Sequence, residues 1–217
     1  MKTEIRSAND PSALARAIDL LRAGEVIAIP TDTVYGVAAD GFDEDAIKAL
    51  FEVKKRPRDK PIPLLLSDAS DLDRVAENVT DAVSRLSDKF WPGPLTLVVA
   101  ARSTVPRILR AEGNSVAVRV PDHATPRALA RALGHPVAAT SANRSGGPDP
   151  STAAQVVAQL GGRIPLVLDG GATRGNVPST VVDCSQDPPR VLRVGALPVI
   201  EVEKVLGLKL ETLPSED

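Results

Sequence analysis

Short apolar runs typical of buried strands alternate along this chain with segments whose apolar residues recur at helical spacing. The strand-like runs are 26–29, 63–66, 95–100, 116–120, 137–139, 164–168, 180–183 and 191–194. Helical segments begin near Asp10, Asp43, Thr80, Thr125, Ser151 and Val199, with Thr125 and Ser151 as expected caps. Such alternation builds an α/β sheet covered on its faces, and consecutive strands within 164–194 favour an antiparallel portion. We therefore expect a single α/β domain with a twisted, mixed parallel and antiparallel sheet flanked by helices.

The composition narrows the classes of partner. With 43% hydrophobic and 25% charged residues the chain is globular, and its net charge of −2 provides no overall attraction to nucleic acid or a membrane. A single cysteine, Cys184, excludes an intramolecular disulfide and fits a reducing compartment. The first residues contain no apolar stretch, so we expect neither a signal peptide nor a membrane anchor, and a cytoplasmic location.

Several familiar nucleotide and metal signatures are absent. The sequence contains no GxxxxGK[ST] loop, no GxGxxG after a strand and no HExxH. His123 and His135 lie far from the cysteine, so we expect no protein-bound metal site.

A basic segment, Lys54–Lys60, has five cationic residues among seven in a chain that is otherwise slightly acidic. It is either a solvated loop or a phosphate clamp, because guanidinium and ammonium groups neutralise polyphosphate oxygens. Two further polar segments, 30–36 and 140–147, each follow a strand, where open α/β sheets bind ligands. Taken alone, each is equally well explained as an ordinary turn or polar loop.

Two arginines stand inside apolar runs. Arg119 lies in Val116–Val120 and Arg193 in Val191–Val194, and neither has an evident acidic neighbour in the sequence. A buried arginine needs a partner or a ligand, so both indicate anionic ligands.

Together these segments resemble the YrdC-like family, the threonylcarbamoyl-AMP synthases. The motifs occur in order and span about three quarters of the chain: PTDTVYG (30–36), KKRP (54–57), WPGPLT (91–96), VAVRVP (116–121), SANRSG (141–146), STVVD (179–183) and RVG (193–195). The resemblance implies a mixed sheet around a central, positively lined cavity. It also implies synthesis of L-threonylcarbamoyl-AMP from L-threonine, bicarbonate or CO2, and ATP with release of pyrophosphate. Mg²⁺ is expected with ATP, and a tRNA-modification complex is expected to receive the product.

The resemblance also implies roles for individual residues. Lys54 and Arg56 match catalytic positions, and Thr33, Arg119, Ser141 and Ser179 match contacts to threonine, with the Arg119 fork suited to the carboxylate. The ATP contacts implied are Arg56, Lys60, Ser115, Thr140, Ser141, Asn143, Ser151 and Arg193. The sequence departs from the family pattern at Leu65, near which many relatives have a histidine.

The expected domain covers residues 1–208, and we expect 209–217 to be a frayed acidic tail. The chain resembles the short, bacterial-type form of the family. Two alternatives remain: a YrdC-like paralogue that makes another carbamoyl-adenylate, and a non-catalytic RNA-binding module that uses the basic segment. Aromatic residues make up only 2% of the chain. This argues against the RNA-binding module, because surfaces that bind RNA usually stack its bases on aromatic rings. A weak direct RNA contact is compatible with either enzyme.

Overall fold

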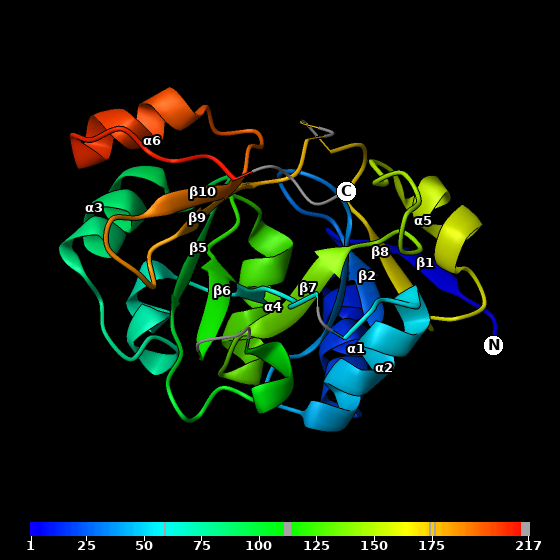
Figure 1. Ribbon diagram of the computed structural model, residues 1–217. Helices are drawn as coiled ribbons and strands as arrows, with labels where there is room; N and C mark the ends of the chain where they lie inside the picture. Colours follow the sequence, from blue (N-terminus) through cyan, green and yellow to red (C-terminus); the bar gives the residue numbers. More distant parts are fainter. Residues whose placement is uncertain (59, 111–113, 174, 176, 214–217) are drawn as a thin grey trace.

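The computed structural model describes residues 1–58, 60–110, 114–173, 175 and 177–213. Within them ten strands form one sheet in the order β1-β8-β2-β3-β7-β4-β6-β5-β9-β10 (Figure 1). The strands are β1 (Glu4–Ser7), β2 (Ile27–Ile29), β3 (Gly36–Asp40), β4 (Leu64–Leu65), β5 (Leu95–Ala100), β6 (Ser115–Arg119), β7 (Val137–Ser141), β8 (Leu166–Asp169), β9 (Thr180–Asp183) and β10 (Arg190–Arg193).

The sheet is mixed, as predicted. Parallel pairs β1–β8, β2–β8, β4–β6 and β5–β9 are interleaved with antiparallel pairs β2–β3, β3–β7, β4–β7, β5–β6 and β9–β10. The antiparallel portion expected within 164–194 is β9–β10. β8 does not join it, because β8 lies between β1 and β2 near the opposite edge of the sheet.

In the described chain, five of the six α-helices begin where a polar side chain satisfies a free amide of the first turn, and the last helix, after Pro198, begins without such a bond. Asp10 accepts a hydrogen bond from the Ser12 amide, and Asp43 accepts from Asp45 and Ala46. The helices are α1 (Pro11–Arg22), α2 (Glu44–Lys54), α3 (Asp81–Phe90), α4 (Ala124–Leu133), α5 (Ala153–Leu160) and α6 (Val199–Leu206), with 3-10 turns at Ala69–Arg74 and Arg107–Leu109.

Two expected caps are wrong by one or two positions. α4 is capped by His123, whose Nδ1 accepts from the Thr125 amide, so Thr125 and Pro126 already lie in the first turn. α5 is capped by Thr152, because the Ser151 hydroxyl donates instead to Oε1 of Gln155.

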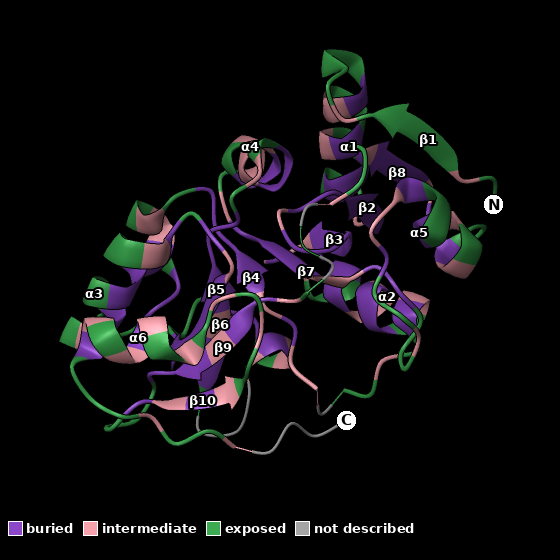
Figure 2. Ribbon diagram, turned by 90° about the horizontal axis from the view of Figure 1, so that it is seen from above, coloured by how far each residue is buried: buried purple, intermediate pink, exposed green. Residues whose placement is uncertain are grey.

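The core divides between the two faces of the sheet. One cluster joins α1 and α4 to β2, β7 and β8 through residues such as Leu21, Leu129 and Leu168. The larger cluster joins α2, α3, α5 and α6 to the other face through residues such as Leu50 and Leu86. Figure 2 shows the result: the central strands are buried, whereas β1 at the edge is exposed.

Two strands and part of the C-terminal segment differ from the expectation. β1 and β3 were not predicted, because β1 has no buried residue and β3 consists mainly of residues with low strand propensity, Gly and Ala. In the segment expected to fray, the Val191 amide donates to the Glu211 carbonyl, and the Leu213 amide donates to the Val191 carbonyl. That part of the tail is therefore bonded to β10, and residues 214–217 lie outside the described chain.

In the described part of the chain, none of the helices has the length and apolar character needed to cross a bilayer.

Candidate active site

A cavity of about 430 Å³ lies on the sheet face opposite the larger core cluster. Side chains alternate between the faces of a strand, so Thr96 and Val98 of β5 line the cavity while Leu97 lies in the core. β6 does the same, with Ala117 and Arg119 toward the cavity. The described lining also includes Thr31, Thr33, Val34, Gly36, Arg56, Lys60, Pro61, Pro63, Leu65, Ala139, Thr140, Ser141, Asp149, Pro178, Ser179, Val181, Leu192 and Arg193.

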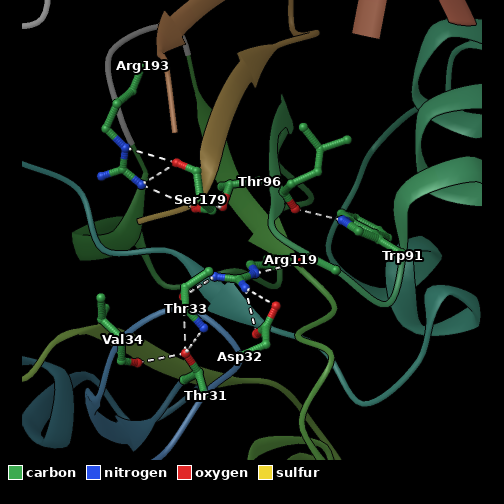
Figure 3. A network of polar contacts seen from close by, with 11 residues as sticks. Thr31, Asp32, Thr33, Val34, Trp91, Thr96, Arg119, Ser179 and Arg193 are labelled. Carbon is green, nitrogen blue, oxygen red and sulfur yellow. Dashed lines mark hydrogen bonds and ion pairs between the residues drawn. The ribbon is translucent and has the colours of Figure 1, made fainter. Parts of the chain in front are cut away.

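Arg119 is held in place by a carboxylate that the sequence did not reveal. Its Nη2 donates to both oxygens of Asp32 at 2.6 Å, and the side chains of the pair are only 7% and 11% exposed (Figure 3). Nη1 donates to Oγ1 of Thr33 at 3.0 Å, and Nε donates to the Gly93 carbonyl at 2.8 Å. The expectation that Arg119 lacks an acidic neighbour is therefore wrong, because the 30–36 segment supplies one.

Burial lowers the pKa of Arg119, while Asp32 opposes that shift. The guanidinium nevertheless remains charged, because the pKa of arginine begins above 12. Arg119 is thus a fixed cation at the end of β6, bonded to the segments 30–36 and 91–96.

Arg193 differs from Arg119 in its surroundings. It stands at the end of β10 and is exposed, so the expectation that it is buried in a strand is wrong. Its guanidinium donates to the Ser179 carbonyl at 2.9 and 3.1 Å and to Oγ of Ser179 at 3.2 Å, and Ser179 in turn bonds Oγ1 of Thr96 (Figure 3).

The glycine of the RVG motif makes this arrangement possible. A Cβ on Gly195 would lie 2.3 Å from the Pro178 carbonyl oxygen and 2.4 Å from the carbonyl carbon of Ser179. Only a residue without a side chain lets the strand end approach so closely, and this approach places Arg193 beside Ser179.

The basic segment does not form a uniform loop. Arg56 and Lys60 line the cavity, and Arg56 folds back to donate to the carbonyls of Lys60 at 2.9 Å and Pro61 at 3.1 Å. Lys54 instead ends α2 and is 1% exposed. Helical spacing indicates the burial of Lys54, since this residue follows the buried Ile47, Leu50 and Phe51 by seven, four and three positions and so lies on the same helix face.

Lys54 supports the loop at the end of β7. Its Nζ donates to the Ser141 carbonyl and, at 2.8 Å, to Oδ1 of Asn143, which also accepts from the Ser141 hydroxyl at 2.7 Å. Nδ2 of Asn143 donates to the Gly147 carbonyl, so the protein occupies both lone pairs of Oδ1 and one of the two N–H groups of this amide. Burial, followed by repulsion from Arg56, lowers the pKa of Lys54 to about 7.

Tyr35 fixes the far end of the 30–36 segment. Its hydroxyl donates to the Gly171 carbonyl at 2.7 Å and accepts from the Gly170 amide at 3.1 Å. Burial raises the pKa of this phenol to about 12, so it stays protonated and keeps both bonds at neutral pH.

The structure brings together eight of the residues expected in the site. Thr33, Arg56, Lys60, Arg119, Thr140, Ser141, Ser179 and Arg193 all line the cavity. Lys54, Ser115, Asn143 and Ser151 are not among the lining residues. Ser115 is at the other end of β6 from Arg119, opposite Ala100, while Lys54 and Asn143 lie behind Ser141.

Sequence reasoning missed four polar residues of this region: Thr31, Asp32, Thr96 and Asp149. Thr31 and Asp32 stand in the PTDTVYG motif and Thr96 in WPGPLT, so the motifs held the signal. Asp149 lines the cavity, and its charge opposes the lowering by burial of the pKa values of Lys54 and Arg193. Nothing in the local sequence distinguishes Asp149 from a loop aspartate.

The arrangement suits an anionic ligand that also has hydrogen-bonding groups. Four cationic side chains, of Arg56, Lys60, Arg119 and Arg193, face one carboxylate, that of Asp149, among the described lining residues. Hydroxyls of threonine and serine stand between them. Within the described chain, acidic residues, histidines and the cysteine form no group of three that would hold a metal ion.

Comparison with known proteins shows the relatives of this chain. The Sua5/YciO/YrdC family model, described as telomere recombination, matches residues 19–195. A threonylcarbamoyl-AMP synthase of Pyrococcus abyssi is 42% identical over 191 residues, which are 88% of this chain and 56% of that protein. The Bacillus subtilis threonylcarbamoyl-AMP synthase is 42% identical over 207 residues, 94% of this chain and 59% of that protein. The chain thus spans less than two thirds of the length of both relatives.

A solved structure shows the same fold. The crystal structure of P. abyssi Sua5 complexed with L-threonine superposes with a TM-score of 0.93 at 39% sequence identity, covering 98% of this chain and 63% of that one.

The buried Lys54 predicts a pH-dependent stability. Its pKa is about 7 in the folded chain and near 10.5 when solvated, so between these values the unfolded chain holds a proton that the folded chain lacks. The free energy of unfolding should therefore rise with pH across this window, by at most about 1.4 kcal/mol per unit.

In Lys54→Met this contribution should disappear, whereas in a control, Lys89→Met at an exposed position on α3, it should remain. Urea unfolding at several pH values from 7 to 10 measures both. Parallel curves for the wild type and Lys54→Met would contradict a depressed pKa.

Proposed function

This chain belongs to the Sua5/YciO/YrdC family, and we propose that it makes L-threonylcarbamoyl-AMP from L-threonine, bicarbonate or CO2, and ATP, with release of pyrophosphate. One observation carries the proposal. The cavity on β5 and β6 holds cationic side chains suited to a polyphosphate, Arg56, Lys60 and Arg193, beside a Thr33–Arg119 pair suited to a small polar ligand. The name of the P. abyssi relative and the threonine complex of P. abyssi Sua5 support this assignment.

The chemistry needs little from the protein beyond position and charge. The threonine amine loses a proton and adds to CO2, which gives a carbamate. A carbamate oxygen then attacks the α-phosphorus of ATP, a P–O bond forms, and the bond to pyrophosphate breaks. Such phosphoryl chemistry relies mainly on alignment and on neutralisation of the phosphate oxygens.

The residues divide between the two substrates in this proposal. Thr33, Arg119 and Ser179 contact threonine, and Arg56, Lys60, Thr140 and Arg193 contact ATP, with Ser141 between them. Lys54 keeps the Ser141 carbonyl and Asn143 in position rather than touching the reacting atoms. Contacts of Ser115, Asn143 and Ser151 with ATP stay predictions, since none of the three lines the cavity.

In this cavity Mg²⁺ would bind only together with the phosphates of ATP. The ion is commonly held by one or two carboxylates together with substrate phosphates, and Asp149 supplies one carboxylate in the described lining. When bound, Mg²⁺ would neutralise phosphate charge. The acceptor of the product, in this proposal, is a complex that modifies tRNA in the cytoplasm.

The proposal predicts a substrate dependence. Release of pyrophosphate from ATP should require both L-threonine and bicarbonate, because the carbamate is the nucleophile. The measurement is pyrophosphate release with each component omitted and with other amino acids in place of threonine. A rate that does not depend on threonine would instead favour a paralogue that makes another carbamoyl-adenylate.

Arg56 provides a second prediction. Arg56→Ala should weaken ATP binding roughly 10- to 150-fold, since a hydrogen bond to a charged group contributes about 1.5–3 kcal/mol. Arg58→Ala is the matched control, because Arg58 is exposed in the same segment and does not line the cavity. Calorimetric titration with ATP measures both variants.

A melting curve checks that Arg56→Ala remains folded, because this change also removes two bonds to the 60–61 backbone. Unchanged ATP affinity together with lost RNA affinity would favour the RNA-binding module.

A further inference from the structure

The two threonines of the 30–36 segment have a hydrogen-bond direction that the structure fixes. The Thr31 hydroxyl donates to the Val34 carbonyl at 2.6 Å, and a hydroxyl has only one proton. In the 3.1 Å contact between the two hydroxyls, Thr33 must therefore be the donor. Oγ1 of Thr31 also accepts from the Thr33 amide at 3.1 Å, so both of its lone pairs are occupied.

Thr33 is consequently left with acceptor capacity alone. Its proton goes to Thr31, and one of its two lone pairs accepts from Nη1 of Arg119 at 3.0 Å. Thr33 lines the cavity, so its remaining lone pair is what it can offer a ligand there. The ligand group that meets Thr33 must then be an N–H or O–H donor and not a carboxylate.

Arg119 occupies one of the two lone pairs of Thr33, and the orientation of Arg119 depends on Asp32. The guanidinium donates to Asp32 from Nη2, to Thr33 from Nη1 and to the Gly93 carbonyl from Nε. The second N–H of Nη1 meets no acceptor in the described part of the chain. Asp32 bonds the guanidinium (Figure 3), yet Arg119 lines the cavity and Asp32 does not, so Asp32 holds Arg119 from outside the lining.

We propose that Asp32 is a positioning residue: through Arg119 it holds the Thr33 hydroxyl in place and occupies one of its lone pairs, so that the remaining lone pair recognises a donor of the substrate. Asp32 then holds Nη2 of Arg119, so the substrate meets an N–H of Nη1 and its carboxylate is not bonded by both terminal nitrogens. This inference rests on the proposed function, with L-threonine as the ligand, and assigns its amine or its hydroxyl to Thr33.

The first test is calorimetric titration of Asp32→Asn, which keeps the size of the side chain and removes its charge. L-Threonine should bind at least tenfold more weakly than to the wild type, while ATP affinity stays within about twofold. Asp81→Asn, at an exposed ion pair on α3, is the control for loss of a carboxylate and should bind both ligands as the wild type does.

A merely structural role for Asp32 predicts a different result. Asp32→Asn would then melt at a lower temperature, yet the folded protein would bind threonine with unchanged affinity, and that outcome overturns the proposal. Tighter threonine binding also overturns it, because Asp32 would then be occupying the place of the substrate carboxylate. Failure of the wild type to bind threonine at all would overturn the proposed function, and this inference with it.

The second test identifies the donor by combining Thr33→Val with two analogues. L-2-Aminobutyrate lacks the hydroxyl of threonine, and (R)-3-hydroxybutyrate lacks the amine. Thr33→Val should weaken the binding of L-threonine. It should have little effect on the binding of the analogue that lacks the donor facing Thr33. Equal weakening of threonine and of both analogues would overturn the assignment of an acceptor role to Thr33.

Discussion

The site depends on one buried ion pair, between Arg119 on β6 and Asp32 in the loop after β2. Removing either residue would destabilise the fold, because the other charge would stay buried without a partner to offset the cost of its desolvation. The pair also connects parts of the chain that lie far apart in sequence, since the same guanidinium bonds Thr33 and the Gly93 carbonyl. Three of the sequence motifs therefore meet at a single side chain.

The cavity exists because β5 and β6 present different residues to their two faces. Leu97 and Val118 complete the core on one side, whereas Thr96, Ala117 and Arg119 leave a polar hollow on the other. Supporting contacts surround this hollow without lining it: Asp32 behind Arg119, and Lys54 and Asn143 behind Ser141. We infer that the sequence motifs contain two kinds of residue: those that contact the ligand, and those that hold the contacting residues in position.

The sequence predicted the mixed sheet and six helices, because most strands are rich in Val, Leu and Ile and the helical segments have apolar residues at helical spacing. It did not predict β3, whose Gly-Val-Ala-Ala-Asp sequence has little strand propensity and which is placed by pairing with β2 and β7. It also could not reveal the partner of Arg119, since Asp32 is 87 residues away and only tertiary structure brings them together. The burial of Lys54, by contrast, was readable from helical spacing.

A crystal structure of this chain with bound L-threonine tests the role of the Asp32–Arg119 pair most directly. Arg119 should still bond both oxygens of Asp32, and a nitrogen or hydroxyl oxygen of threonine should lie within hydrogen-bond distance of Oγ1 of Thr33. A complex in which the threonine carboxylate has replaced Asp32 at Nη2 of Arg119 would contradict that role.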